Sequence, residues 1–122
     1  MTAFLSADWF AALHGEGVEL DDCTIEVTVL GAPDGDVKWH VEVSGGRVVA
    51  AAGARPDADI VVTLPYDDTV AVARGELAAS VAFMRGRMKT AGDPGRLLDV
   101  LAATARPEYD TARAALAAAT EF

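Results

Sequence analysis

The sequence predicts an α+β fold: a five-stranded, mostly antiparallel sheet covered on one face by helices. Three observations favour it. Apolar residues alternate with polar ones over residues 24–29 and 37–43, which is typical of strands, but recur at helical spacing over residues 5–13. Glycine and proline separate these periodic segments. The length of 122 residues and the apolar share of 52% suit one domain, residues 1–122, with a packed core.

The first element is expected to be a short amphipathic helix. Leu5, Trp9 and Leu13 are spaced to fall on one helical face. Ser6 is placed to cap the start of this helix, because a serine oxygen can accept a hydrogen bond from a backbone N–H of the first turn. Gly15 follows the last apolar residue and is expected to end the helix.

Three strands in a meander are expected next. The turn sequence Ala-Pro-Asp-Gly at residues 32–35 joins the two alternating runs. Gly45-Gly46 can adopt the positive φ angles of a tight hairpin leading into a strand over residues 47–52. Residues 60–64 are almost wholly apolar, as in a strand covered on both faces. The exposed face of the sheet is expected to carry the polar residues of the first two strands: Glu26, Thr28, Lys38, His40 and Glu42.

The second half of the chain is expected to be mainly helical. Asp67 or Asp68 is placed to cap one helix and Asp93 another, whereas Gly75 and Gly86 interrupt helical segments. The expected elements are a helix over residues 69–74, a helix over residues 76–83, a strand over residues 87–91, a helix from Pro94 and a last helix from Glu108 to Phe122.

The charge balance argues against polyanionic partners. The chain has 10 Lys and Arg against 19 Asp and Glu, a net charge of -9, which repels nucleic acid and anionic membrane surfaces. No apolar run approaches the roughly 20 residues of a membrane span, so no stable membrane insertion is expected. The N-terminal residues lack a basic secretory leader, and the sequence ends in Thr-Glu-Phe instead of a peroxisomal Ser-Lys-Leu. We therefore expect a monomeric, cytoplasmic protein.

No residue pattern typical of catalysis or metal binding stands out. Cys23 is the only cysteine, and its position next to a strand favours a small half-buried hydrophobe over a reactive thiol. His14 and His40 have no ligand-type spacing with each other or with cysteine, and no serine lies in a Gly-x-Ser-x-Gly segment. The acidic pairs lie in loops or at helix starts, where capping and solvation explain them. We expect no enzyme activity, no cofactor and no metal.

The most distinctive segment is apolar and flexible. Phe83, Met84 and Met88 surround Gly86. Methionine is unbranched and polarizable, so it adapts to ligands of varied shape. Taken alone, such a cluster more often fills a core.

This segment resembles the sterol carrier protein 2 family. The run Ala-Phe-Met-Arg-Gly-Arg-Met-Lys at residues 82–89 is similar to the family's Phe-Met-x-Gly-(Lys/Arg)-apolar-Lys segment, and Gly92-Asp93 follows where the family has its Gly-Asp helix start. The strand entry at residues 56–64 and Gly75 also match the family's order. Two departures are Pro94, which stiffens the start of its helix, and an alanine-rich last helix, which would leave either a wider cavity or a thinner packed layer.

The resemblance implies a small, standalone, bacterial-type carrier with an apolar tunnel between sheet and helices. It implies binding or transfer of a sterol, fatty acid or fatty acyl-CoA without covalent chemistry, and a partner enzyme of lipid metabolism is a further expected partner. The C-terminal segment is expected to help close the tunnel. By the same resemblance, the residues expected to line the tunnel are Phe83, Met84, Met88, Leu97, Leu101 and Leu116.

Two other functions stay open from the sequence. One is an accessory module with a closed core that binds a partner protein and no lipid. The other is a small isomerase-type enzyme, which would need an Asp or Glu inside the pocket. The acidic residues that can be placed all fall in turns or caps, so this alternative ranks third.

Overall fold

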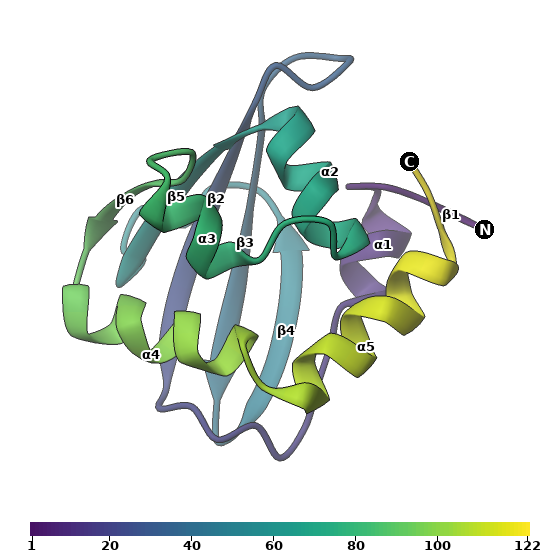
Figure 1. Ribbon diagram of the computed structural model, residues 1–122. Helices are drawn as coiled ribbons and strands as arrows, with labels where there is room; N and C mark the ends of the chain where they lie inside the picture. The colour runs from purple at the N-terminus through teal and green to yellow at the C-terminus, as the bar shows by residue number, and fades with distance from the viewer.

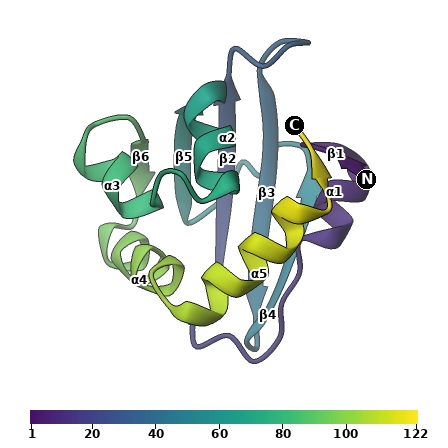
Figure 2. The ribbon, with the colours of Figure 1, turned by 45° about the vertical axis from the view of Figure 1, so that its right-hand side comes forward.

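The computed structural model describes residues 1–122 and confirms the α+β fold (Figure 1). The strands of the main sheet are β2 (Cys23–Leu30), β3 (Val37–Ser44), β4 (Arg47–Ala52), β5 (Ile60–Pro65) and β6 (Lys89–Gly92), in the order β4-β3-β2-β5-β6. The helices are α1 (Ala7–Ala12), α2 (Tyr66–Arg74), α3 (Ala79–Met84), α4 (Pro94–Thr104) and α5 (Pro107–Ala118). Figure 2 shows α2 to α5 on one face of the sheet, with α1 at the β4 edge.

The sheet is built as a meander extended by two further strands. β2 pairs antiparallel with β3, and β3 with β4, as expected. Gly45 and Gly46 join β3 to β4 with φ angles of 57° and 78°, which a residue with a side chain adopts only with strain. β5 returns to pair parallel with β2, and β6 pairs antiparallel with β5. The sheet is therefore mostly antiparallel.

Local sequence signals explain where several helices begin. The hydroxyl oxygen of Ser6 accepts a hydrogen bond from the Trp9 N–H at 3.2 Å, which confirms the predicted cap of α1. The Asp93 carboxylate accepts hydrogen bonds from the N–H groups of Gly95 (2.9 Å) and Arg96 (3.2 Å) at the start of α4. Both caps satisfy backbone donors that have no partner within their helix.

Some local expectations were wrong. α2 begins at Tyr66 after Pro65 and has no side-chain cap, so neither aspartate in its first turn caps it. The Asp68 carboxylate instead forms an ion pair with the Arg87 guanidinium, 2.7 Å away, in the segment before β6. The second helix starts at Ala79, three positions after the predicted start at Glu76. A small parallel pair, β1 (Thr2–Ala3) with β7 (Thr120–Glu121), was not expected at all.

The outer face of the sheet is less exposed than predicted. Glu26 is only 8% exposed, although its strand position is on the polar face. The loop between β4 and β5 folds over this face, and the Arg55 N–H donates to the Glu26 carboxylate at 2.9 Å. The Arg55 guanidinium also lies 3.5 Å from Glu42, and the Gly53 carbonyl 2.9 Å from His40 Nδ1. A long-range loop therefore buries a carboxylate that the strand pattern assigns to solvent.

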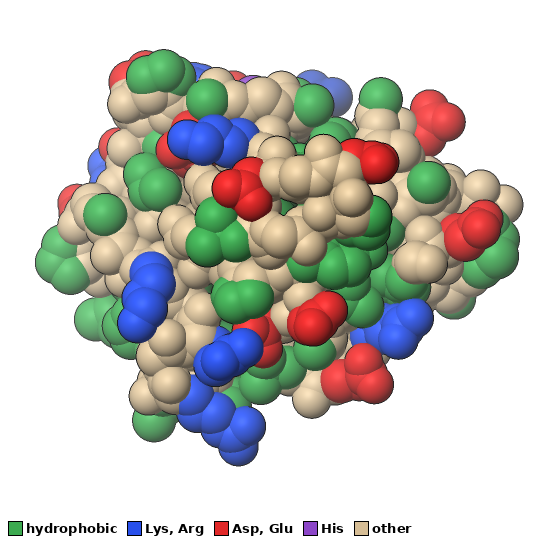
Figure 3. All heavy atoms as spheres, turned by 90° about the horizontal axis from the view of Figure 1, so that it is seen from above, with side chains coloured by type: hydrophobic (Ala, Val, Ile, Leu, Met, Phe, Trp, Pro, Cys, Tyr) green, Lys and Arg blue, Asp and Glu red, His purple; other side chains and the backbone are tan.

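The core lies between the sheet and the helices. Strand alternation turns one set of side chains towards the helices: Ile25, Val27, Val29, Trp39, Val43, Ile60, Val62 and Leu64, all buried. On the face seen from above in Figure 3, side chains of both charges lie among scattered apolar ones. None of the helices has both the length and the apolar character needed to cross a membrane.

Candidate functional site

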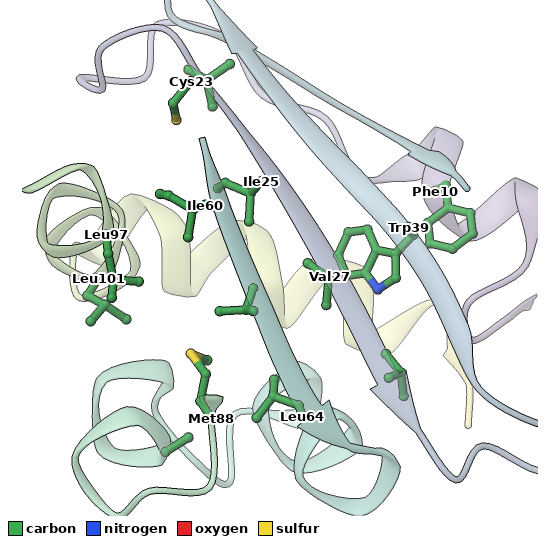
Figure 4. Close-up of a cluster of buried hydrophobic side chains, with 14 of the residues drawn as sticks. Phe10, Cys23, Ile25, Val27, Trp39, Ile60, Leu64, Met88, Leu97 and Leu101 are labelled. Carbon is green, nitrogen blue, oxygen red and sulfur yellow. The ribbon is translucent and has the colours of Figure 1, made fainter. Parts of the chain in front are cut away.

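The layer between sheet and helices is tightly packed beneath α3 and α4. Met88, Leu97 and Leu101 are each 8% exposed and lie together with Ile60 and Leu64 (Figure 4). Ala82 of α3 is fully buried in the same cluster. This part of the layer is a close-packed core, and a ligand would have to displace side chains to enter it.

The layer is less complete beneath α5. Val41, Ala50 and Val48 point towards the helices, because Val41 pairs with Ile25 and Ala50, while Val48 pairs with the buried Val43. They are nevertheless only half-buried. We call these three side chains the apolar strip. Figure 2 shows α5 passing in front of β3 and β4, which carry the strip.

The composition of α5 explains why the strip is not sealed. The helix has no fully buried residue, and much of its length is alanine. Leu116 is its one large aliphatic side chain, and it is half-buried against the core. Alanine reaches too short a distance to fill the space between a helix and a sheet, so the strip keeps part of its exposure.

α5 is held by a contact with α2 and by the strand that follows it. The Arg113 guanidinium donates to the Ala73 carbonyl at the end of α2 (3.1 Å) and pairs with Asp110 (3.1 Å). After α5, β7 pairs with β1, and the N–H of Phe4 donates to the Glu121 carbonyl at 2.9 Å. We call the β1–β7 pair the terminal clasp.

Aromatic contacts reinforce the terminal clasp. The rings of Phe4 and Phe122 lie 5.0 Å apart, and the Arg74 guanidinium lies 4.7 Å from the centre of the Phe122 ring. The last helix is thus bound to α2 through Arg113 near its middle and to β1 through the strand that follows it, and it has no fully buried residue.

Two hollows adjoin these helices. One of about 100 Å³ lies among α2, α4, α5 and the segment leading into α3, with Val72, Leu77 and Tyr109 in its wall. Its volume is below the roughly 300 Å³ of ordinary ligand pockets.

The wall of this hollow includes one phenol with a shifted pKa. Burial raises the pKa of the Tyr109 phenol, and the nearby Arg113 charge opposes this rise. The other hollow, about 460 Å³, is an open surface groove whose wall is mostly polar, including Glu19 and Arg106, so it does not suit an apolar ligand.

The six predicted lining residues fall into separate places. Met88, Leu97 and Leu101 lie together, and Phe83 packs half-buried against the same cluster. Leu116 belongs to α5. Met84 is 81% exposed at the end of α3. Their role as ligand-binding residues stays a prediction. The sequence reasoning did not single out the apolar strip, although the alternation in residues 37–43 and the alanines of residues 50–52 were its visible signals.

Buried chemical groups in the layer are few. The buried polar residues are Glu26, Thr69 and Thr120, and Glu26 faces the opposite side of the sheet. Burial is the main cause that raises the pKa of the Cys23 thiol, which favours its unreactive, protonated form. No three His, Cys, Asp or Glu side chains are grouped to hold a metal ion.

Comparison with known proteins agrees with this architecture. The model of the SCP-2 sterol transfer family matches residues 14–104. No curated protein matches the sequence as a relative. Among solved structures, palmitated SCP2L2 from Aedes aegypti superposes with a TM-score of 0.63 at 17% identity, covering 74% of this chain and 78% of that one.

Two further solved structures are similar. The sterol carrier protein domain 2 of Helicoverpa armigera has a TM-score of 0.60 and 20% identity, with 79% of this chain and 72% of that one covered. A conserved hypothetical protein of Thermus thermophilus, described as possibly a sterol carrier protein, has a TM-score of 0.60 and 18% identity, with 89% and 76% covered. At these identities the structures show a shared fold.

Proposed function

Because the chain belongs to the SCP-2 sterol transfer family, whose general activity is lipid binding or transfer, we propose that it binds an apolar ligand between the sheet and α5. The ligand classes proposed are a sterol, a fatty acid or a fatty acyl-CoA, held without covalent chemistry. The observation that carries this proposal is the half-buried apolar strip beneath an alanine-rich helix.

The energetics of such binding are adequate. Each methylene group transferred from water contributes roughly 0.8 kcal/mol, so a chain of about twelve carbons supplies roughly 10 kcal/mol. Association and ordering offset at least 4 kcal/mol of this. The remainder corresponds to a dissociation constant on the order of 10–100 μM, tighter for longer chains.

Entry of the ligand requires α5 to move. The hollow of about 100 Å³ beside α5 cannot contain a lipid. α5 has no buried residue, so lifting it exposes little core. Leu116 would then meet the ligand directly. Phe83, Met88, Leu97 and Leu101 would contact it only if α4 shifted as well.

The buried groups support binding over catalysis. An isomerase-type reaction needs a carboxylate within reach of the ligand. Glu26 is the buried carboxylate, and it is turned to the outer face beneath Arg55. The cytoplasmic location, the single domain over residues 1–122 and a partner enzyme of lipid metabolism stay predictions from the sequence.

A pair of substitutions on β4 tests the proposal. Ala50→Leu fills the space above the strip, whereas Ala51→Leu adds the same volume on the outer face, because Ala51 pairs with His40. We expect Ala50→Leu to weaken binding of a fluorescent fatty acid and a fluorescent sterol at least tenfold and Ala51→Leu to leave it unchanged. Circular dichroism checks that both variants fold.

Native mass spectrometry of the freshly purified protein completes the test. A carrier should retain lipid, while an accessory module with a closed core should show only the mass of the chain. Absence of lipid in the spectrum together with no binding of either fluorescent probe would refute the proposed function. If the two folded leucine variants bind the probes equally well, the ligand does not bind beneath α5.

A further inference from the structure

Trp39 carries the one buried side-chain polar atom that lacks a hydrogen-bond partner. The residue is 8% exposed, and its indole Nε1 meets no acceptor. The other buried polar residues are satisfied: Thr69 donates to the Pro65 carbonyl, and Thr120 to the Leu116 carbonyl. A buried donor without an acceptor is unfavourable, so proteins rarely keep one unless a water, an ion or a ligand uses it.

The indole lies beside the proposed ligand space. Trp39 pairs with Val27 on β2 and with Ala52 on β4, and Val41 follows it on the same face of β3. The ring of Phe10 packs against one side of the indole, with the centroids 5.4 Å apart. Figure 4 shows the six-membered ring of the indole directed from β3 towards Val27, with the nitrogen at the lower edge of the indole. The unused N–H therefore lies on the helix-facing side of the sheet, on the same face of β3 as Val41 of the apolar strip.

We propose that Trp39 Nε1 donates a hydrogen bond to an oxygen of the bound ligand, and that this oxygen belongs to a neutral group such as an alcohol or an ester carbonyl. The inference rests on the proposed function, because it needs a ligand over the strip. An indole N–H only donates, so the group it recognises must be an acceptor. A hydrocarbon leaves the donor unsatisfied, whereas an oxygen at this point satisfies it.

The charges around the layer favour a neutral oxygen over a carboxylate. No Lys, Arg or His is among the buried residues. The arginines on the helices nearest the strip are already engaged: Arg113, in the middle of α5, is bound to the Ala73 carbonyl and Asp110, and Arg74, at the end of α2, lies over Phe122. A carboxylate brought to Trp39 would lose its hydration and gain no opposite charge.

The test uses the indole N–H groups as reporters. The chain has 2 Trp residues, Trp9 and Trp39, so the nitrogen-15 spectrum should show two indole signals, which Trp9→Phe and Trp39→Phe assign. On titration with 1-dodecanol, the Trp39 indole proton should shift downfield, and its exchange with solvent should slow. The Trp9 indole proton should move much less. Dodecane should bind without the downfield shift.

Affinities provide a second measurement. Trp39→Phe keeps an aromatic ring but removes the N–H, so it should weaken 1-dodecanol binding about fivefold and leave dodecane binding nearly unchanged. Trp9→Phe is the matched control, since it makes the same change in the same aromatic cluster, 5.5 Å away between ring centroids. Dodecanoate at neutral pH should bind the wild-type protein more weakly than 1-dodecanol.

The outcomes separate the two proposals. If the wild-type protein binds 1-dodecanol but the Trp39 signal does not shift, water or a neighbouring ring satisfies the N–H, and the inference is wrong while lipid binding stands. The shift of the Trp39 signal is measured on the wild-type protein, so this outcome does not depend on whether Trp39→Phe folds. Tighter binding of dodecanoate than of 1-dodecanol overturns the neutral-oxygen assignment. If none of the three probes binds, the proposed function fails and the inference with it.

Discussion

Replacing Gly92 with alanine should destabilise the protein far more than the same change at Gly86. Gly92 has a φ of 105° and pairs with Ile60 across the β5–β6 ladder. A Cβ atom there would lie 2.2 Å from the backbone oxygen of Asp59 and 3.1 Å from the Cα of Ile60. Gly86 also has a positive φ, 73°, but a Cβ atom there would meet nothing within 4 Å. Gly86→Ala therefore measures the cost of the positive φ alone, whereas Gly92→Ala adds the cost of steric overlap with β5.

The expected magnitudes follow from these contacts. A positive φ costs a residue with a side chain roughly 1–2 kcal/mol, which applies to both sites. At Gly92, β6 must also move away from β5, which weakens the hydrogen bond from the Asp93 N–H to the Asp59 carbonyl, now 3.0 Å, by about 1 kcal/mol. It also loosens the packing around Ile60, which is 1% exposed, for about 1–2 kcal/mol more. We expect a loss of roughly 3–5 kcal/mol for Gly92→Ala.

Urea denaturation measures the difference. The fluorescence of Trp9 and Trp39, both buried, reports unfolding. With a slope of about 1.5 kcal/mol per molar urea, the midpoint should fall by roughly 2–3 M for Gly92→Ala and by about 1 M for Gly86→Ala. Failure of Gly92→Ala alone to fold agrees with this expectation. Equal losses at the two sites would show that the close approach of β6 to Asp59 is not what requires glycine.

Two further predictions concern α5 and the thiol. Arg113→Met removes the hydrogen bond to the Ala73 carbonyl and the pairing with Asp110, so stopped-flow uptake of a fluorescent lipid should become severalfold faster; an unchanged rate would contradict movement of α5 as the entry step. Burial raises the pKa of the Cys23 thiol above 9.0, so the folded state keeps a proton that the unfolded state releases, and stability should fall as pH rises through about 9. Urea midpoints at pH 8 and pH 10 should show this fall in the wild-type protein, and Cys23→Ala should lessen it; identical pH slopes in the two proteins would exclude the thiol as a cause.

Elements determined by neighbouring residues could be predicted from the sequence. The cap at Asp93 followed by Pro94 marks the start of α4, because both residues act on the first turn of their own helix. The meander follows from alternation and from Gly45-Gly46. The burial of Glu26 could not be predicted, because its partner Arg55 lies 29 positions along the chain in a loop without periodicity. The parallel pairing of β5 with β2 depends on that same loop.

The candidate site was harder to predict, because the exposure of the apolar strip on β3 and β4 depends on the short side chains of α5, which is distant in the sequence. The segment from Phe83 to Met88 is distinctive in sequence, yet Met88 is packed in the core and Met84 points to solvent. The alanines of α5 allowed either a wider cavity or a thinner packed layer, and composition alone does not decide between these. In the structure Val41 is half-buried, so α5 does not cover β3 completely, but the hollow beside α5 holds only about 100 Å³.

One cause connects the features beneath α5. Short side chains leave the apolar strip incompletely covered, and the same shortage removes the core contacts that would otherwise hold the helix in place. The helix is instead held by the hydrogen bond from Arg113, near its middle, to the Ala73 carbonyl of α2 and by the terminal clasp after its last turn. If a ligand completes this layer, the Trp39 indole N–H, which has no acceptor within the protein, can bond to the ligand. Filling the strip with larger side chains should then stabilise the protein and abolish binding together, since the space that weakens the empty protein is the space that the ligand needs.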